Sequence, residues 1–200
     1  MALAAGADLL GLVSEMPSGP GVISLDKIED IVASLPADSK TVLLTSKRHH
    51  LDILKQHNQI KTWGIQLVDK LPETELMKVK KSLPDTRLIQ VIHVRDASSI
   101  SEALYYEALV DIILLDSGSP GAKIKTLGGT GKTHDWKISQ EICTRNSLPV
   151  LLAGGLSPDN IQAARTVVNP SGFDLCSGVR IDGNLDQRKL HKFMGLARGE

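Results

Sequence analysis

Short apolar runs recur along the whole chain and predict its architecture. Within a run such as Ile112–Leu115, apolar and polar residues do not alternate, which is typical of strands buried on both faces of a parallel sheet. The runs of this kind are Leu9–Val13, Thr41–Thr45, Gly64–Val68, Arg87–Val94, Asp111–Asp116, Pro149–Gly155 and Asp174–Val179. Their spacing leaves room for a helix after each strand.

Helix-period stretches lie between the apolar runs. Ser24 is expected to cap the first helix. The buried face of that helix is expected to carry Ile28, Ile31, Val32 and Leu35. Further helices are predicted at Thr74–Lys81, at Ser98–Leu109, and after a cap at Ser157 with Pro158 in the first helical position.

The repeated strand–helix unit fits two α/β architectures, a (βα)8 barrel and an open doubly wound sheet. A barrel needs eight strands, and seven are visible. Ala2–Asp8 has the character of the last helical turn before the first visible strand, so the unit needed for a barrel would precede Met1. No linker or change in composition divides the chain, and its 200 residues are expected to form one domain.

Composition narrows the range of partners. Apolar residues make up 42% and charged residues 23%, as in ordinary globular proteins. The 23 basic residues equal the 23 acidic ones, which gives no support for a nucleic-acid or acidic-membrane partner. Cys143 and Cys176 are far apart and suggest neither a disulfide framework nor a cysteine zinc site. No apolar run approaches the roughly 20 residues that span a bilayer.

The most glycine-rich segment is Leu127–Thr133, which contains Gly129, Gly131 and Lys132. Such a loop exposes backbone N–H groups to a phosphate, or it is a plain surface turn. A P-loop would need glycine where Thr126 stands, so the Walker interpretation fails.

A second glycine pair, Gly154 and Gly155, follows a predicted buried strand and precedes a helix. Ser177 and Gly178 stand near the end of the next predicted strand. In a barrel these segments would be the loops after the last two strands, which is the usual position of a phosphate site. The alternative is that both glycine sets are only turns.

Asp116 ends a strand of Ile and Leu, where the catalytic residues of barrels stand. Partial burial would raise its pKa and suit it to general-acid work, whereas an ordinary turn-capping Asp is the alternative. His93 lies inside an apolar strand and is interpreted as a hydrogen-bonded core histidine rather than a catalytic one. His49, His50 and His57 are expected on a solvated helix face rather than at a metal.

Several segments together carry a family resemblance. Residues 114–116 read L-L-D and are followed by G-G-T-G-K-T-H-D-W at 128–136, L-A-G-G-L-S-P-D-N at 152–160 and S-G-V at 177–179. Near the start, residues 5–13 read A-G-A-D-L-L-G-L-V, and Q-L stands at 66–67. With these motifs the chain resembles phosphoribosylanthranilate isomerase, the (βα)8-barrel enzyme of tryptophan biosynthesis. His134 stands where the family has Phe.

The resemblance implies an α/β fold of the (βα)8 TIM-barrel type over residues 1–200, with the first strand missing from this chain. It implies an isomerase that converts N-(5-phosphoribosyl)anthranilate to a 1-deoxyribulose phosphate by an Amadori rearrangement, with Asp116 as the general acid. The residues expected at the substrate and its phosphate are Gly129, Gly131, Lys132, Gly154, Gly155, Ser177 and Gly178. No metal or organic cofactor is implied. The expected partner is a small sugar phosphate, bound by a cytoplasmic monomer or homodimer.

The departures from the family pattern fall on functional positions. The family's base is the Cys of a K-x-C-G motif on the first strand, which these 200 residues do not contain. Gly21 stands where the family has the Arg that holds the anthranilate carboxylate, Val68 replaces the His of Q-L-H-G, and Arg180 replaces the Glu of S-G-V-E. A diverged sugar-phosphate isomerase or aldolase-like enzyme, or a non-catalytic phosphate-ligand binder, is therefore the alternative.

Overall fold

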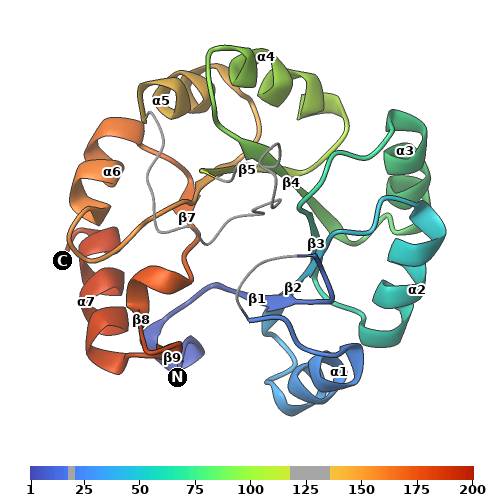
Figure 1. Cartoon of the computed structure of the whole chain (residues 1–200), viewed down its shortest axis with the longest axis horizontal. Helices are drawn as coiled ribbons and strands as arrows, with labels where there is room; N and C mark the ends of the chain where they lie inside the picture. Colours follow the sequence, from blue (N-terminus) through green and yellow to red (C-terminus); the bar gives the residue numbers. More distant parts are fainter. Residues whose placement is uncertain (18–20, 118–135) are drawn as a thin grey trace.

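The computed structural model describes residues 1–17, 21–117 and 136–200, and within them seven parallel strands form one curled sheet (Figure 1). The strands are β1 (Leu9–Val13), β2 (Lys40–Thr45), β3 (Gly64–Leu67), β4 (Arg87–His93), β5 (Ile112–Asp116), β6 (Val150–Leu152) and β7 (Gly172–Phe173). They are hydrogen-bonded in the order of the sequence, β1 to β7. A doubly wound sheet would reverse its strand order at a switch point, so the open-sheet alternative is wrong.

The helices form an outer ring around the sheet (Figure 1). They are α1 (Leu25–Ser34), α2 (His50–Ile60), α3 (Glu73–Ser82), α4 (Ser98–Tyr105), α5 (Trp136–Arg145), α6 (Ile161–Val168) and α7 (Gln187–Arg198). Short 3-10 helices occur at η1 (Leu3–Ala5), η2 (Tyr106–Ala108) and η3 (Ser177–Val179), and a small antiparallel hairpin pairs β8 (Arg180–Ile181) with β9 (Asn184–Leu185). This is the barrel-type α/β arrangement with seven strands in the described residues, in which β1 and β7 are the two edge strands.

Alternation along the strands separates two apolar layers. Residues at one parity pack inside the curled sheet, and those at the other parity pack against the helices. The inner cluster contains Val42, Val68, Ile89, Val91, Leu114 and Ala153. The main cluster between sheet and helices contains, among others, Ile65, Leu67, Leu88, Ile92, Ile113 and Leu115. The strand residues of both layers are aliphatic, which accounts for strands that show no polar alternation.

Several boundaries predicted from the sequence are wrong. The run Pro149–Gly155 forms a strand only at Val150–Leu152, and the helix predicted at Ser98–Leu109 ends at Tyr105. The seventh strand is Gly172–Phe173 rather than Asp174–Val179, because its partner β6 is only three residues long and the last ladder bond runs from the amide of Asp174 to Leu152 O. The sixth helix begins at Ile161 and not at Pro158. The turn before this helix is closed by a hydrogen bond from the amide N–H of Ser157 to Asn160 Oδ1. The first helix is capped by Ser24 as predicted, with the Lys27 amide 3.2 Å from its hydroxyl.

No helix in the described part of the chain is long and apolar enough to cross a membrane.

Candidate functional site

The inward-facing residues at the carboxyl ends of β4 and β5 are His93 and Asp116. Strand alternation dictates this placement, since Val91 and Leu114, two positions earlier on each strand, belong to the inner cluster. The parallel register pairs His93 directly with Asp116. An imidazole and a carboxyl group from neighbouring strands therefore share the top layer of the barrel.

Asp116 is a buried carboxyl group, with 7% of the residue exposed. The amide N–H of Ser117 donates to its Oδ1 at 2.8 Å. Desolvation raises the pKa of Asp116, and the Ser117 amide and the charge of His93 oppose that shift. A carboxyl group that keeps its proton more readily than usual suits general-acid chemistry, as the sequence position suggested.

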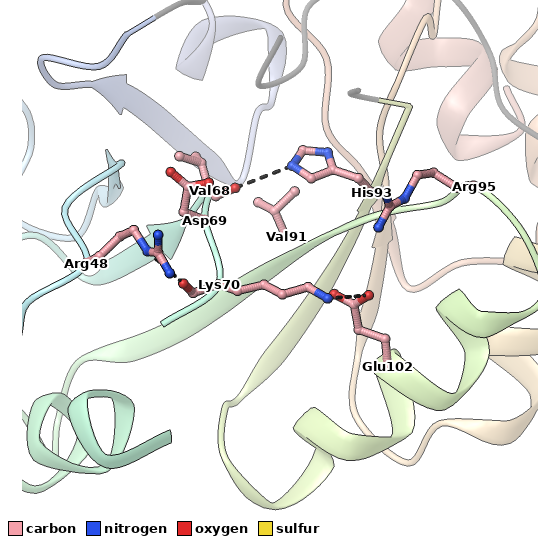
Figure 2. A pocket seen from close by; sticks show the side chains of 8 residues that line it. All are labelled: Arg48, Val68, Asp69, Lys70, Val91, His93, Arg95 and Glu102. Carbon is pink, nitrogen blue, oxygen red and sulfur yellow. Dashed lines mark hydrogen bonds and ion pairs between the residues drawn. The ribbon is translucent and has the colours of Figure 1, made fainter. Parts of the chain in front are cut away.

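His93 has one bonded and one unbonded ring nitrogen. Its Nε2 lies 3.4 Å from the carbonyl oxygen of Val68, toward which the ring points in Figure 2. Its Nδ1 is buried and has no hydrogen-bond partner within residues 1–17, 21–117 and 136–200. The expectation of a fully hydrogen-bonded core histidine is therefore wrong. Burial lowers the pKa of His93, and the nearby charge of Asp116 acts against that shift.

A cavity of about 240 Å³ opens beside His93 (Figure 2). It is lined by Arg48, Val68, Asp69, Lys70, Val91, His93, Arg95 and Glu102. Lys70 Nζ pairs with Glu102 at 2.8 Å, and Arg48 Nε donates to the carbonyl of Lys70 at 3.1 Å. The sequence reasoning missed these charged side chains, although several lie just beyond β2, β3 and β4, where a barrel site would be sought.

The two glycine loops predicted to bind phosphate lie against each other. A Cβ on Gly178 would stand 2.9 Å from the carbonyl carbon of Leu156 and nearer still to its oxygen, so η3 packs directly on the loop after β6. Gly154 and Gly155 have φ of +85° and +64°, a region that L side chains rarely adopt. Among the described residues, no hydrogen bond engages the amide N–H of either glycine.

We call these two loops, with Gly154, Gly155, Ser177 and Gly178, the glycine rim. The glycine rim continues to Asp116. A Cβ on Gly154 would lie 2.8 Å from the amide nitrogen of Ser117, the residue that follows Asp116. The fold thus brings four predicted binding residues and the predicted acid to one edge of the barrel. The other three predicted residues, Gly129, Gly131 and Lys132, lie outside the described residues.

Asp174 is a second carboxyl group that the sequence reasoning overlooked. It follows β7, and its amide donates to Leu152 O at 2.9 Å. Desolvation of the carboxyl group and then the charge of Asp116 raise the pKa of Asp174 to about 6, although the residue as a whole is exposed. Its position directly after a barrel strand was the available signal.

The remaining histidines divide into two kinds. His57 is buried, with Nε2 3.0 Å from Thr62 O, so its expected place on a solvated face is wrong. In the described part of the chain, the grouping that could hold a metal ion is His49, His50 and Glu75. The carboxylate of Glu75 already accepts a hydrogen bond from the amide N–H of His50 at 2.8 Å and lies 2.6 Å from His50 Nδ1. Lys78 Nζ donates to its other oxygen at 2.8 Å. These bonds and the lysine charge disfavour a cation there.

The ring of parallel strands, with polar groups gathered at its carboxyl end, places the chain among the enzymes built on the (βα)8 barrel. The model of the N-(5'phosphoribosyl)anthranilate (PRA) isomerase family matches residues 16–195. The chain belongs to this family.

Individual relatives agree with the family match. The N-(5'-phosphoribosyl)anthranilate isomerase of Methanocella arvoryzae is 34% identical over 194 residues, covering 96% of this chain and 89% of the relative. That of Nostoc punctiforme is 36% identical over 189 residues, covering 94% and 86%. The crystal structure of phosphoribosyl anthranilate isomerase from Thermotoga maritima superposes with a TM-score of 0.84 at 28% identity, covering 100% of this chain and 92% of that one.

Proposed function

We propose that this chain catalyses the Amadori rearrangement of N-(5-phosphoribosyl)anthranilate to 1-(2-carboxyphenylamino)-1-deoxyribulose 5-phosphate, a step of tryptophan biosynthesis. The observation that carries the proposal is the buried Asp116 at the carboxyl end of β5, beside the glycine rim. Burial raises the pKa of Asp116, which favours the protonated form that a general acid needs. Family membership supplies the substrate class.

In this proposal Asp116 donates its proton to the furanose ring oxygen. The C1′–O4′ bond then breaks, and the electron pair of the anilino nitrogen forms the Schiff base. Loss of the C2′ proton gives an enaminol, which becomes the ketose when C1′ is protonated. Each bond change is coupled to a proton transfer, so acid–base groups suffice for the reaction.

The phosphate is assigned to the glycine rim, Gly154, Gly155, Ser177 and Gly178. Gly154 and Gly155 offer amide N–H groups that no described residue engages, and such groups are donors for an anion. Gly129, Gly131 and Lys132 are assigned to the same substrate from the family motif alone.

Further assignments accompany this function. Residues 1–200 are proposed to act as one barrel domain, as a cytoplasmic monomer or homodimer, with a small sugar phosphate as partner. Both cysteines are free in the structure, which fits a reducing compartment.

The test is turnover of N-(5-phosphoribosyl)anthranilate, followed by loss of its fluorescence. Asp116→Asn should lower kcat by at least about 10²-fold, since a positioned acid contributes that much. Asp85→Asn is the matched control, because this exposed Asp lies in the turn before β4, at the opposite end of the strand from the site. Activity of the unaltered chain and of Asp85→Asn, lost only in Asp116→Asn, supports the proposal.

Two other results would contradict this proposal. Full activity of Asp116→Asn would refute the acid role. No turnover by the unaltered chain, together with binding of inorganic phosphate, would favour the diverged enzyme or the non-catalytic binder. Gly21 is the specific reason to keep that second candidate, because no side chain occupies the position of the family's carboxylate-binding Arg.

A further inference from the structure

The cavity of about 240 Å³ beside His93 is a part of the barrel mouth that the acid and phosphate roles leave unused. We call it the charged cavity. Val68 and Val91, which belong to the inner cluster, form its apolar part. Charged side chains from the loops after β2, β3 and β4 and from α4 form the rest of its wall (Figure 2). Since whole small-molecule sites measure about 300–1,000 Å³, a cavity of this size fits one ring-sized group.

The charged cavity lies beyond the acid, on the side away from the glycine rim. The strands are hydrogen-bonded in sequence order, so the ends of β6 and β7 lead into the rim, β5 carries Asp116, and β2, β3 and β4 border the cavity. His93 on β4 is paired with Asp116 and also lines the cavity. A molecule that is held at the rim and reaches Asp116 can therefore extend into the charged cavity.

The covalent structure of the proposed substrate has the same order. Its phosphate is on C5′, its ring oxygen O4′ is bonded to C1′, and C1′ also carries the aminobenzoate group. With the phosphate at the glycine rim and O4′ at Asp116, the aminobenzoate group is the part that extends toward β4 and β3. The cavity at that place must then accept an aromatic ring with a negative charge.

The charges on the wall of the cavity favour such an anion. Lys70 Nζ pairs with Glu102 at 2.8 Å, and these two charges largely cancel. The other charged side chains that line the cavity are Arg48, Arg95 and Asp69, which are two cations against one anion. The wall therefore has a net positive charge, which one carboxylate would balance.

Arg48 is restrained before a ligand binds. Its Nε donates to the carbonyl oxygen of Lys70 at 3.1 Å, and the ion pair between Lys70 and Glu102 restrains that residue in turn. A guanidinium group has five N–H donors in a planar fork, and this bond uses one of them. The fork matches a carboxylate, and its plane can stack on an aromatic ring. In Figure 2, Arg95 stands on the other side of Val91 from Arg48.

We propose that the charged cavity binds the aryl carboxylate carried on C1′ of the substrate, with Arg48 and Arg95 as the residues that select for the carboxylate group. This inference rests on the proposed isomerase function. Val68 and Val91 pack against the ring. The cations for the carboxylate come from the loops after β2 and β4, whereas Gly21 has no side chain to offer.

Binding can be measured without turnover, by calorimetric titration with anthranilate and with aniline at saturating inorganic phosphate. The two probes share the amino-substituted ring and differ in the carboxylate. The unaltered chain should bind anthranilate about 10–100-fold more tightly, because hydrogen bonds between charged groups contribute about that factor. Arg48→Met and Arg95→Met keep an apolar stem and remove the charge. Each should reduce the preference for anthranilate, and the double variant should bind both probes alike.

Arg145→Met is the matched control, because this arginine is the last residue of α5 on the outer ring and pairs there with Glu141. It should leave the binding of both probes unchanged. Arg48→Lys keeps the charge without the planar fork, so it should retain part of the preference. With N-(5-phosphoribosyl)anthranilate, the double variant should raise KM about 10–100-fold and change kcat only a few-fold, because the ground state and the transition state lose the same contact.

Equal binding of anthranilate and aniline by the unaltered chain would overturn the proposal, as would a double variant that keeps the full preference. If the double variant fails to fold, the unaltered chain and the single variants decide by the same ratio. Turnover with an unchanged KM in the double variant would leave the isomerase function standing and remove the role of the cavity. Absence of turnover together with arginine-dependent binding of anthranilate would remove the isomerase function and leave the aryl-carboxylate site standing.

Discussion

Gly178 offers the sharpest test of the phosphate rim, because the effect of one methyl group there can be worked out from the structure. In Gly178→Ala the new Cβ would lie 2.9 Å from the carbonyl carbon of Leu156, 3.1 Å from Ser157 Cα, and closer than either to Leu156 O. All of these are backbone atoms and cannot rotate away. The loop after β6 or η3 must therefore move.

The size of the effect follows from that movement. Contacts below 3.0 Å are essentially never made by real Cβ atoms, so the two loops must separate by about 1 Å. Overpacking of this kind costs about 1–3 kcal/mol of stability. A 1 Å displacement of a binding group costs on the order of 10²-fold in rate. Both effects act on the loops assigned to the phosphate.

The assay uses inorganic phosphate as the probe. In the unaltered protein, phosphate at 100 times its Kd should stabilise the fold by about 2.7 kcal/mol, seen as a rise in Tm. Gly178→Ala should start from a lower Tm and lose most of that rise, and its kcat/KM should fall about 10²-fold. Gly195→Ala on α7 is the control, since its new Cβ would meet nothing nearer than Glu200 Oε2 at 3.9 Å.

Alanine is favoured over glycine within a helix by about 0.8–1.0 kcal/mol, so Gly195→Ala should be slightly more stable and respond to phosphate normally. A Gly178→Ala protein whose Tm rises on phosphate addition as much as that of the unaltered chain would refute the reasoning. It would show that the contact between η3 and the loop after β6 plays no part in anion binding.

Three further predictions concern other parts of the chain. Gly21→Arg has open space but a φ of +81°, so it should cost about 1–2 kcal/mol of stability and lower the KM for N-(5-phosphoribosyl)anthranilate about 10-fold or more. An unchanged KM would place the anthranilate carboxylate elsewhere. The backbone N–H of His50 is the main cause of a Glu75 pKa of about 2, so this carboxylate stabilises the fold above pH 4.5 and loses that effect as pH falls toward 2. Glu75→Gln should flatten chemical denaturation midpoints across that range, and an equally steep curve would contradict this. Burial raises the pKa of Cys143 to about 11, so at pH 8 iodoacetamide should label it about 100-fold more slowly than an ordinary thiol, measured by peptide mapping. Rapid labelling would show that the thiol is accessible and ionised.

The sheet could be predicted from sequence because its strands are apolar and its central ones, such as β3 and β5, are buried on both faces. Runs such as Leu9–Val13 have no polar interruptions, and β1 has the same bounds as the run that predicted it. The predicted bounds of the seventh strand are wrong because they too were taken from an apolar run. Asp174–Leu175–Cys176 reads as a buried strand end, yet pairing stops where β6 runs out at Leu152. The length of a ladder is set by its partner, which a local pattern does not contain.

The site was predictable only where residue type and position coincide. Asp116 met both conditions, as a carboxylate at the end of an apolar strand. His93 met them too, but its chemistry depends on whether each ring nitrogen has a partner. That is a property of tertiary structure, decided by the carbonyl of Val68, the residue that follows β3. The contact of Gly178 with Leu156 likewise joins segments whose proximity only the folded chain reveals.

The two imidazole positions show how a barrel site can change without a change of fold. The family motif places a His at position 68, where this chain has Val68. Val68 and Val91 pack in the same inner cluster, and His93, two residues further along β4, turns its ring toward the Val68 carbonyl (Figure 2). An imidazole is thus delivered to the same rim from the neighbouring strand. Because barrel sites are assembled from the ends of separate strands, one group can move to the next strand while the core beneath it stays intact. A comparison made position by position would count Val68 as a loss, whereas the rim retains an imidazole.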